Sequence, residues 1–572
     1  YVFADKRVHF NGQPIALVIA DTYENAVYAA SRIKATYQKQ KSNTDLDTAI
    51  KTGKPLKGDN YKPYVRGEAG AWKKVAIKIE AEYSIPVEVN NPMEMHGITV
   101  VWEAEKKVTV YEKTQTLQDS QKNIMNIFGL KEEDVRVITK FVGGGFGSAS
   151  NTWPHSIAAL IGGRKIGRPL KLVLNRDQMF NTVGYRPQSK QKIGIGAGAD
   201  GKLFGITHKA MATTSSYGEF PEKIVNATRS SYSCANVNTS YTVYPLDLSL
   251  PTTMRGPGFT SGVFALESAM DELAHSLHLD PVEFRLRNYT DTDPYNNNLP
   301  FSSKFLKEAY KAGAEKINWQ DRNPQPRSMK QGDWLIGYGM AGAMYPATRD
   351  DSPTASVAAT FFADGSLILR CAVTDMGPGT ATSMTKLASD TLGLPPGNIK
   401  FELGDTDFPP GFRQGGSVTT SALGTAVYNV CANLKEKIGA LIESDSIFKA
   451  IKPEGLLFEG GFIKLGSDHS KKISYTDVTK QAGIKQLKSL EVSEKNILQG
   501  YSAFSFAAHF VKLMVNARTG VVKIMNVVCA VDGGKIVNEE TARSQIIGSV
   551  AGGIGMALFE GGVIDHRYGR WV

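Results

Sequence analysis

The sequence predicts a mixed α/β (α+β) protein, with a short α/β segment followed by two long α/β blocks. Apolar runs of strand length alternate with amphipathic helical segments along the chain, and glycine-rich turns join several predicted strands to predicted helices. Because 572 residues are too many for one core, roughly three or four domains are expected. We predict units at 1–40, 64–325 and 335–572, with a linker at 41–63.

The opening segment is predicted to run strand, helix, strand. The apolar run 15–20 has the length of a strand, and Asp21 or Thr22 can cap the helix that follows. Alanines and Ile33 share one face of that helix. The linker after it is rich in lysine, threonine, glycine and asparagine, which are typical of irregular structure.

The first long block contains its clearest helix in "SGVFALESAMDELAHSLHLDP". Apolar residues recur there at helical spacing and predict a core-facing stripe made of Phe264, Met270, Leu273, Ala274 and Leu277. A proline-rich passage at 321–334 leads into the second long block. In that block, strands are expected at 356–371, 509–515 and 521–529, and helices at 382–392 and 426–442.

Composition and charge argue against several kinds of site. The net charge is +10, but lysines and arginines are scattered among 56 acidic residues, with no basic run interleaved with aromatic residues, so no nucleic-acid partner is expected. No segment reaches ~18 consecutive apolar residues, so no membrane span is expected. The 4 cysteines form no C-x-x-C pair, which gives no local iron–sulfur or zinc spacing. Most of them are expected to be small buried apolar residues.

Glycine-rich turns before helices provide the candidate ligand site. The turns contain Gly143–Gly147 in "FVGGGFG", Gly377–Gly379 in "MGPG", and the hydroxyl-rich run 417–421 in "GGSVTTS". Glycines let backbone N–H groups approach an anion, and a helix N-terminus adds partial positive charge. One such turn alone is more often a tight connection, and neither a P-loop nor a dinucleotide fingerprint is present. Together the turns indicate an elongated phosphorylated ligand held at several points.

Four groups of motifs follow one another along the chain: "FVGGGFG", "TMRGPG", "DMGPGTAT…LGDTDFPP…GGSVTTSALGTAV" and "AFSFAAHFVKLMVNARTGVV…ARSQIIGSVAGGIGMALFE". In this order and approximate spacing, nearly the whole chain resembles the large subunit of the molybdenum hydroxylases, the xanthine dehydrogenase and aldehyde oxidase family. "RVHFNGQPIALVIAD" is similar to the end of that family's α/β hammerhead domain. "WPHSIAAL" and "VGYRPQS" are most similar to the bacterial three-subunit aldehyde oxidoreductase branch. The resemblance implies the end of a hammerhead domain followed by two elongated molybdopterin-binding α/β domains.

The resemblance also implies the cofactor, molybdopterin cytosine dinucleotide with molybdenum. The pterin's dithiolene sulfurs hold the metal in this family, so no protein ligand to the metal is expected. Carried over by motif, Gln115 approaches the apical oxygen, while Gly145, Phe146 and Gly147 line the metal end opposite Arg255. The residues expected to hold the pterin and pyrophosphate are Gly377, Pro378, Gly379, Gly416, Ser417 and Thr419. Those expected to close over the cofactor, within or just after 535–541, are Lys535, Asn538, Thr541 and Gln545.

The activity that the resemblance implies is oxidation of an aldehyde to a carboxylic acid, with water as the oxygen source. Electrons must leave, and the chain has no cluster or flavin fingerprint, so [2Fe-2S] clusters and FAD are expected on separate partner subunits. Two alternatives remain open, a purine or N-heterocycle hydroxylase subunit and a non-catalytic cofactor-binding paralogue. The missing fingerprints oppose an NAD- or nucleotide-binding enzyme. The sequence does not decide between a cytoplasmic and a periplasmic location.

Departures from the family pattern bear on substrate. Purine-oxidising members have a glutamate where this chain has Ser150, and an aromatic residue where it has Pro257. A cysteine follows the matching arginine in carbon-monoxide-oxidising members, whereas Gly256 stands here. These differences favour an aldehyde, because a polar recognition site discriminates through the groups it provides. The family's catalytic glutamate is expected beyond Val572, and Glu560 does not match its motif, so no catalytic residue is assigned and the chain is interpreted as a fragment at both ends.

The histidines are interpreted as structural rather than catalytic. His96 lies near Glu94 in "NNPMEMHG", but family members use this stretch chiefly for packing. His155 is expected to cap or pack its helix, and His509 to be buried and hydrogen-bonded in a strand.

Overall fold

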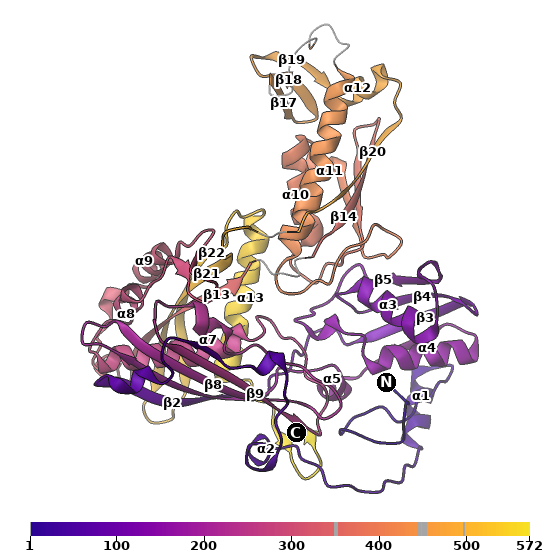
Figure 1. The fold of residues 1–572 in the computed structure, drawn as a ribbon. Coiled ribbons are helices and arrows are strands. Elements are labelled where there is room, and N and C mark those ends of the chain that lie inside the picture. The colour runs from indigo at the N-terminus through magenta and orange to yellow at the C-terminus, as the bar shows by residue number, and fades with distance from the viewer. Residues whose placement is uncertain (1, 348–352, 443–447, 449–454, 496–497) are drawn as a thin grey trace.

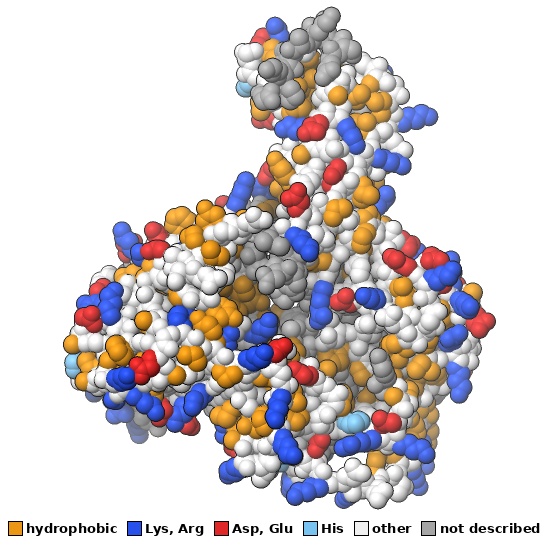
Figure 2. All heavy atoms as spheres, in the orientation of Figure 1, with side chains coloured by type: hydrophobic (Ala, Val, Ile, Leu, Met, Phe, Trp, Pro, Cys, Tyr) orange, Lys and Arg blue, Asp and Glu red, His pale blue; other side chains and the backbone are white. Residues whose placement is uncertain are grey.

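The computed structural model describes residues 2–347, 353–442, 448, 455–495 and 498–572. Figure 1 shows two lobes side by side at the bottom and an elongated lobe that rises from the junction between them. Each lobe combines strands with helices, which confirms the mixed α/β class. Lysine and arginine side chains alternate with acidic ones over the face shown in Figure 2. Among the described residues, no helix is long and apolar enough to cross a membrane.

The opening segment forms helix α1 (Tyr23–Ser31), with Thr22 as its N-cap, as predicted. The strand predicted at 15–20 is wrong, because these residues pair with no neighbouring strand. Leu17 and Ile19 instead place their side chains against Gly162 of helix α4 (Pro154–Ile166). The segment predicted as a linker contains a short helix, α2 (Leu46–Thr52).

The lower right lobe of Figure 1 is built on a four-stranded sheet in the order β5-β4-β3-β6. The strands are β3 (Gly97–Ala104), β4 (Lys107–Glu112), β5 (Val135–Ile138) and β6 (Leu170–Val173). Helix α4 packs on β3, and α3 (Leu117–Phe128) packs on β5. The core between them is made of valine, isoleucine and leucine side chains.

The lower left lobe contains a five-stranded sheet in the order β1-β9-β8-β7-β2. The strands are β1 (Tyr64–Arg66), β2 (Ile77–Ile85), β7 (Ser189–Ala197), β8 (Leu203–Ser215) and β9 (Val237–Leu246). Helix α7 (Phe259–Ser276) covers β2 and β7, and α8 (Pro281–Arg287) follows it. Met270, Leu273 and Ala274 are buried as predicted. Phe264 is 44% exposed, and its ring packs edge-on against Tyr83 instead of entering the core.

A second sheet in this lobe has the order β12-β13-β21-β22. Its strands are β12 (Lys330–Gln331), β13 (Trp334–Pro346), β21 (Phe504–Asn516) and β22 (Val522–Asp532), and the last two confirm strands predicted from the sequence. Helix α9 (Leu306–Ile317) packs on β21 and β22. Helix α13 (Glu539–Leu558), yellow in Figure 1, lies at the junction of the lobes.

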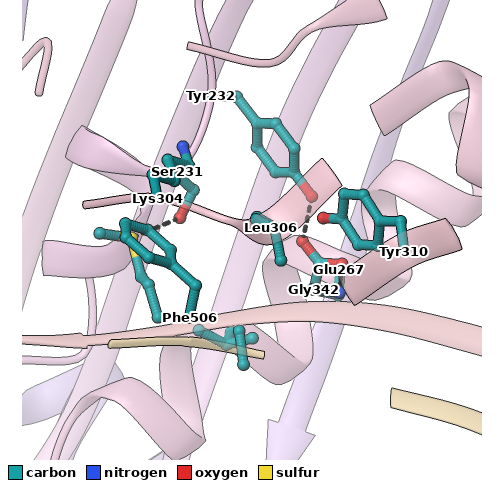
Figure 3. Close-up of a pocket in the computed structure, with 11 residues that line it drawn as sticks. Ser231, Tyr232, Glu267, Lys304, Leu306, Tyr310, Gly342 and Phe506 are labelled. Atoms are coloured by element: carbon teal, nitrogen blue, oxygen red, sulfur yellow. Dashed lines mark hydrogen bonds between the residues drawn. The ribbon is translucent and has the colours of Figure 1, made fainter. Parts of the chain in front are cut away.

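Glu267 of α7 ties the two sheets of the lower left lobe together. Its carboxylate accepts hydrogen bonds from the Tyr232 hydroxyl at 2.5 Å and from the backbone N–H of Gly342 in β13 at 2.6 Å. The Arg285 Nε donates to the same carboxylate at 2.7 Å. A small cavity beside this carboxylate is lined by Tyr310 and Lys304 among others (Figure 3).

The upper lobe carries a sheet in the order β16-β15-β14-β20. Its strands are β14 (Ser356–Phe362), β15 (Leu367–Cys371), β16 (Ile399–Leu403) and β20 (Gln486–Val492). The predicted helices correspond to α10 (Thr380–Leu392) and α11 (Thr419–Leu441), which pack together on this sheet. Cys371 and Cys431 are buried in this core, and Cys234 is buried in the lower left lobe, as expected for small apolar residues. A small sheet and a helix complete the lobe: β17 (Leu456–Glu459), β18 (Phe462–Leu465), β19 (Asp468–Ser474) and α12 (Tyr475–Gln481).

The remaining elements are short. They are α5 (Arg176–Thr182), α6 (Asn226–Ser230), β10 (Thr292–Asp293), β11 (Leu299–Pro300), β23 (Ile564–Asp565) and β24 (Arg570–Trp571). One-turn 3₁₀ segments lie at Asp59–Tyr61, Ala71–Lys74, Glu132–Asp134, Ser148–Ser150, Trp319–Asp321 and Pro396–Asn398.

Candidate functional site

The first glycine turn lies against the side chain of Gln115. Strand β5 ends at Ile138, and the turn that follows leads into α4. A Cβ atom added to Gly145 would lie 2.5 Å from the Gln115 Oε1 atom. The absence of a side chain at Gly145 is therefore what allows the glutamine amide to approach the turn.

The Gln115 amide has one group paired and one group free. Its Nε2 donates to the Gln414 carbonyl oxygen at 2.7 Å, and because a carbonyl can only accept, this bond fixes which way round the amide lies. Oε1 is buried and has no hydrogen-bond partner among the described residues. A buried oxygen without a partner is uncommon and costs free energy, so this atom is a candidate contact for a ligand.

Phe146 and Gly147 connect the first glycine turn to the segment that carries Arg255. Phe146 has a left-handed backbone with φ of 50°, which is uncommon outside glycine and concentrates at functional sites. Its carbonyl oxygen accepts from the backbone N–H of Arg255 at 3.1 Å. Gly147 has φ of 108°, and a Cβ there would overlap the Thr253 carbonyl oxygen. The two turns therefore touch backbone to backbone.

Arg255 and Gln545 meet although they are far apart in sequence. The Arg255 Nη2 donates to the Gln545 carbonyl oxygen at 2.6 Å and to its side-chain oxygen at 3.3 Å. These bonds attach the turn at residues 254–258, here called the Arg255 turn, to helix α13 at the junction of the lobes. Arg255 keeps solvent access, yet partial burial lowers its pKa from the usual value. No carboxylate forms an ion pair with it in the described part of the chain, so its positive charge is available to a ligand.

The second glycine turn contacts the start of helix α13. Gly377 and Gly379 both donate their N–H groups to the Asp375 carboxylate, at 3.0 and 3.3 Å. A Cβ on Gly379 would lie 2.8 Å from a methyl carbon of Thr541. The Thr541 hydroxyl in turn lies 3.3 Å from that of Ser383 in α10. Gly377 faces open space, with nothing within 4 Å of a Cβ built there.

The third turn reaches the first through Gln414. The Gln414 N–H donates to the Gln115 carbonyl oxygen at 3.3 Å, and its side chain exchanges hydrogen bonds with the backbone of Thr374 at 2.7 and 2.9 Å. Gly416 and Ser417 follow with left-handed φ angles of 69° and 61°. Helix α11 then begins at Thr419.

The structure thus brings most of the predicted site residues into contact, but not all of them. Hydrogen bonds or close approaches link Gln115, Gly145, Phe146, Gly147, Arg255 and Gln545 in one cluster and Gly377, Gly379 and Thr541 in another. Asn538 caps α13 by accepting from the Thr541 N–H at 3.1 Å. Within the described part of the chain, Lys535 forms no hydrogen bond or ion pair with either cluster, and Pro378 takes part in the second cluster only through its place between Gly377 and Gly379.

Sequence reasoning missed Gln414, Asp375 and Asn90. Asp375 receives the N–H groups of the second turn and also pairs with the first, since the Val142 N–H donates to its carbonyl oxygen at 2.8 Å. Asn90 donates to the carbonyl oxygens of Phe146 and Thr253 at 2.9 and 3.1 Å. Gln414 and Asp375 stand just before glycine-rich turns, a position that could have drawn attention to them. Asn90 carries no such local signal.

The histidines behave as structural groups. His96 is 1% exposed, its Nε2 lies 3.1 Å from the Ser148 hydroxyl, and burial places its pKa well below the usual value. Burial also lowers the pKa of His155 to about 3. His509 is only partly buried, and its Nε2 lies 3.7 Å from the Cys529 sulfur. The neutral forms of these rings suit packing in the two lower lobes.

The geometry fits an extended ligand whose own atoms coordinate the metal, so that the protein provides none of the metal's ligands. It provides a free oxygen at Gln115, an unpaired cation at Arg255, and an open glycine at Gly377. Thr380, at the start of α10, also has a buried hydroxyl with no partner among the described residues. No group of three or more His, Cys, Asp or Glu side chains in the described ranges is placed to hold a metal ion. These groups can bind a pterin and its phosphates without coordinating the metal.

Protein-family models match nearly the whole chain. The molybdopterin cofactor-binding domain matches residues 54–289, and a second model of that name matches 312–572. The aldehyde oxidase and xanthine dehydrogenase a/b hammerhead domain matches residues 1–41.

Curated relatives and solved structures agree with these models. The aldehyde oxidoreductase molybdenum-binding subunit PaoC of Escherichia coli (strain K12) is 32% identical over 560 residues, covering 98% of this chain and 74% of that protein. The putative xanthine dehydrogenase molybdenum-binding subunit XdhA of the same organism is 25% identical, covering 99% and 77%. Quinoline 2-oxidoreductase from Pseudomonas putida 86 has the same fold, with a TM-score of 0.87 and 19% identity, covering 97% and 74%. The chain therefore belongs to the molybdenum hydroxylase family of aldehyde oxidases and xanthine dehydrogenases, as a molybdenum-cofactor-binding large subunit.

Proposed function

We propose that this subunit serves an enzyme that oxidises aldehydes, especially aromatic ones, to carboxylic acids with water as the oxygen source. The observation that supports the proposal is that the first glycine turn meets both the free Gln115 oxygen and the backbone of Arg255, whose guanidinium has no ion-pair partner among the described residues. The relative with 32% identity is named as an aldehyde oxidoreductase subunit, which supports the same substrate class. The chain spans 74% of that relative, so the complete enzyme is the object of the proposal.

Within the proposal, each predicted residue has a separate task. The molybdenum cofactor, when bound, supplies the redox centre at which the substrate is hydroxylated. The free Gln115 oxygen is a hydrogen-bond acceptor, so it can take a hydrogen bond from an N–H or O–H group at the metal end of the cofactor, and the lack of a side chain at Gly145 lets the glutamine lie against the first glycine turn. Arg255 presents its charge to oxygen that becomes negative during the reaction, where a preoriented donor stabilises the transition state.

The other turns hold the remainder of the cofactor, proposed to be the cytosine dinucleotide form. Gly377 leaves room for the ligand to approach the backbone of the second turn. In the third turn, Ser417 has a left-handed backbone conformation. Thr541 places the start of α13, which Asn538 caps, against Gly379, and Lys535 in the segment before this helix is proposed to close over the ligand. Iron–sulfur and FAD subunits are the proposed acceptors of the electrons.

Ser150 distinguishes the proposed substrate from a purine. Its hydroxyl donates to the Gly147 carbonyl oxygen at 2.5 Å and lies 3.3 Å from the Thr253 hydroxyl. The side chain is short, buried and already paired, so it cannot provide the carboxylate that purine-oxidising relatives use. Pro257 likewise offers no aromatic face for a purine ring.

Metal and nucleotide analysis tests the cofactor. The complete protein, expressed with the machinery that matures molybdenum enzymes, should copurify with stoichiometric molybdenum and release cytidine monophosphate on acid hydrolysis. Absence of molybdenum from folded protein would refute the cofactor assignment. Release of guanosine monophosphate, or of no nucleotide, would refute the cytosine form alone.

A comparison of substrates tests the activity. Benzaldehyde should exceed xanthine on the order of 100-fold in kcat/KM, because the missing purine acceptor costs roughly 1–3 kcal/mol and the missing stacking face about 1 kcal/mol more. The measurement uses the complete assembled enzyme with an artificial electron acceptor. Equal or faster oxidation of xanthine would favour the purine hydroxylase alternative. Loss of all turnover in an enzyme that contains full cofactor would favour a non-catalytic paralogue.

A further inference from the structure

The Arg255 turn rests on a buried ion cluster that the proposed function does not use. Arg186 is 2% exposed and lies between two carboxylates that are each 1% exposed, those of Glu88 and Glu222. Its Nη1 donates to Glu88 at 2.8 Å, and its Nε donates to Glu222 at 3.1 Å. Burial disfavours a charged guanidinium, but the two carboxylates outweigh it and raise the pKa of Arg186. The group is therefore a permanent cation fixed on two sides.

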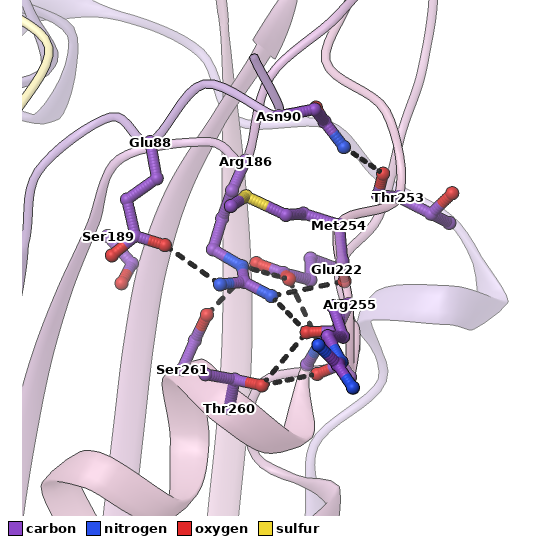
Figure 4. A network of polar contacts seen from close by, with 12 residues as sticks. Glu88, Asn90, Arg186, Ser189, Glu222, Thr253, Met254, Arg255, Thr260 and Ser261 are labelled. Atoms are coloured by element: carbon purple, nitrogen blue, oxygen red, sulfur yellow. Dashed lines mark hydrogen bonds and ion pairs between the residues drawn. The ribbon is translucent and has the colours of Figure 1, made fainter. Parts of the chain in front are cut away.

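The remaining N–H edge of the Arg186 guanidinium points at the backbone of the Arg255 turn (Figure 4). Its Nη2 donates to the carbonyl oxygen of Met254 at 3.1 Å and to that of Arg255 at 2.7 Å. The Thr260 hydroxyl donates to the Arg255 carbonyl at 3.1 Å as well. Only a planar fork with several N–H donors can hold two carboxylates and two carbonyls together.

Glu222 holds the other side of the same turn. Besides Arg186, its carboxylate accepts from the Gly258 N–H at 3.0 Å and from the Ser261 hydroxyl at 3.2 Å. Gly258 has a left-handed φ of 78°, and a Cβ there would lie 2.6 Å from the Lys223 carbonyl oxygen. The turn is therefore clamped from residue 254 to residue 261 by two buried side chains of opposite charge.

Both backbone polar groups of Arg255 are held by hydrogen bonds. Its N–H donates to Phe146 of the first glycine turn, and its C=O accepts from Arg186. The side chain leaves this fixed peptide toward Gln545. A shift of the peptide would therefore move the guanidinium relative to the glycine turn that lines the site.

We infer that Arg186 is a positioning residue, which sets the direction of the Arg255 guanidinium by clamping its peptide through the Glu88–Arg186–Glu222 cluster. The catalytic part of this inference rests on the proposed function, in which Arg255 faces the substrate. In this inference the cluster acts through the backbone of Arg255.

The test compares Arg186→Lys with the matched control Arg285→Lys in the complete assembled enzyme. Arg285 is 0% exposed and is also held by two carboxylates, Glu267 at 2.7 Å and Asp271 at 2.8 Å. Its partners lie on α7 and α8 rather than on the Arg255 turn. Both substitutions disrupt a buried ion cluster, so both should lower the melting temperature. Only Arg186→Lys removes hydrogen bonds that hold the Arg255 turn.

Amide hydrogen exchange gives a readout that does not depend on turnover. The peptide that spans residues 252–262 should exchange faster in Arg186→Lys and at the wild-type rate in Arg285→Lys. Unchanged exchange in Arg186→Lys would overturn the inference whatever the enzyme's substrate. Because this measurement needs no substrate, a failure of the aldehyde assignment leaves it intact.

The kinetic readout is a double-mutant cycle with Arg255→Ala. Arg186→Lys alone should lower kcat/KM by roughly 10- to 100-fold, the scale expected when a reactive group is misplaced by about 1 Å. In the Arg255→Ala background it should cost almost nothing further, since the group it positions is gone. Equal losses in the two backgrounds, or an equal loss in Arg285→Lys, would show that Arg186 only stabilises the fold and would overturn the inference.

A second variant keeps the test decisive if Arg186→Lys does not fold. Glu222→Gln retains acceptors for Arg186 and Gly258 but removes one of the charges that hold the guanidinium. It should show the same pattern with smaller effects, namely faster exchange over 252–262 and a kcat/KM loss that Arg255→Ala abolishes. Wild-type exchange and kinetics in Glu222→Gln would overturn the inference.

Discussion

Replacing Gly145 by alanine should loosen the site at Gln115. The added methyl carbon would lie 2.5 Å from Oε1 and 3.5 Å from Cδ of that glutamine, and 3.7 Å from the Ala149 methyl. The first of these contacts is too short to be tolerated, so one partner must move. Backbone bonds to Ala149 and Gln414, at 2.9 and 3.3 Å, hold Gln115 on both sides, which leaves rotation of the amide as the available response.

Rotation of the Gln115 amide breaks its 2.7 Å hydrogen bond to Gln414. Leaving those buried groups unpaired costs about 1–3 kcal/mol, which should lower the melting temperature by a few degrees. It also turns Oε1 away from the first glycine turn, so the fraction of chains that retain molybdenum should fall. Calorimetry measures the first effect and metal analysis by mass spectrometry the second.

Two companion variants separate the clash from other causes. Gly397→Ala adds a methyl where nothing lies within 4 Å of the new carbon, so it should change neither stability nor molybdenum content. In Gln115→Ala the clashing atom is absent, and adding Gly145→Ala to that background should cost no further stability. Wild-type melting and full molybdenum content in Gly145→Ala would refute the reasoning, as would equal destabilisation in the presence and absence of the glutamine.

Two further predictions concern the first glycine turn and the pH dependence of folding. Gly147→Ala should destabilise the protein more than Gly145→Ala does, because φ is 108° and the new carbon would overlap the Thr253 carbonyl oxygen; relative melting temperatures check this. His155 has a folded pKa of about 3 against an ordinary 6.5, so the unfolded state binds more protons and stability falls as the pH falls from about 6.5 toward 3. Urea unfolding should show this loss at up to about 1.4 kcal/mol per pH unit and a shallower slope in His155→Leu; parallel profiles would contradict it.

Local sequence patterns were enough to predict much of the secondary structure. The helical stripe of α7, the helices α10 and α11, and the strands β21 and β22 all occur where periodicity placed them. The two wrong predictions, the strand at 15–20 and the core position of Phe264, are explained by the residues that surround these segments in the fold. The run 15–20 has strand-like composition, but its side chains pack on α4 and its backbone finds no partner strand. Phe264 has the right spacing for the core, yet it lies at the rim against Tyr83.

The sequence by itself determined the fold class, the family and the turns that can approach an anion, because each depends on short motifs and local periodicity. Tertiary structure alone decided which of those turns meet. The Gln115 bond to Gln414 spans 299 residues, and the Arg255 bond to Gln545 spans 290. The support of Arg255 by Arg186 across 69 residues is of the same kind. Hydrogen bonds between distant segments have no periodic signature, since their geometry exists only once the lobes have packed around their junction.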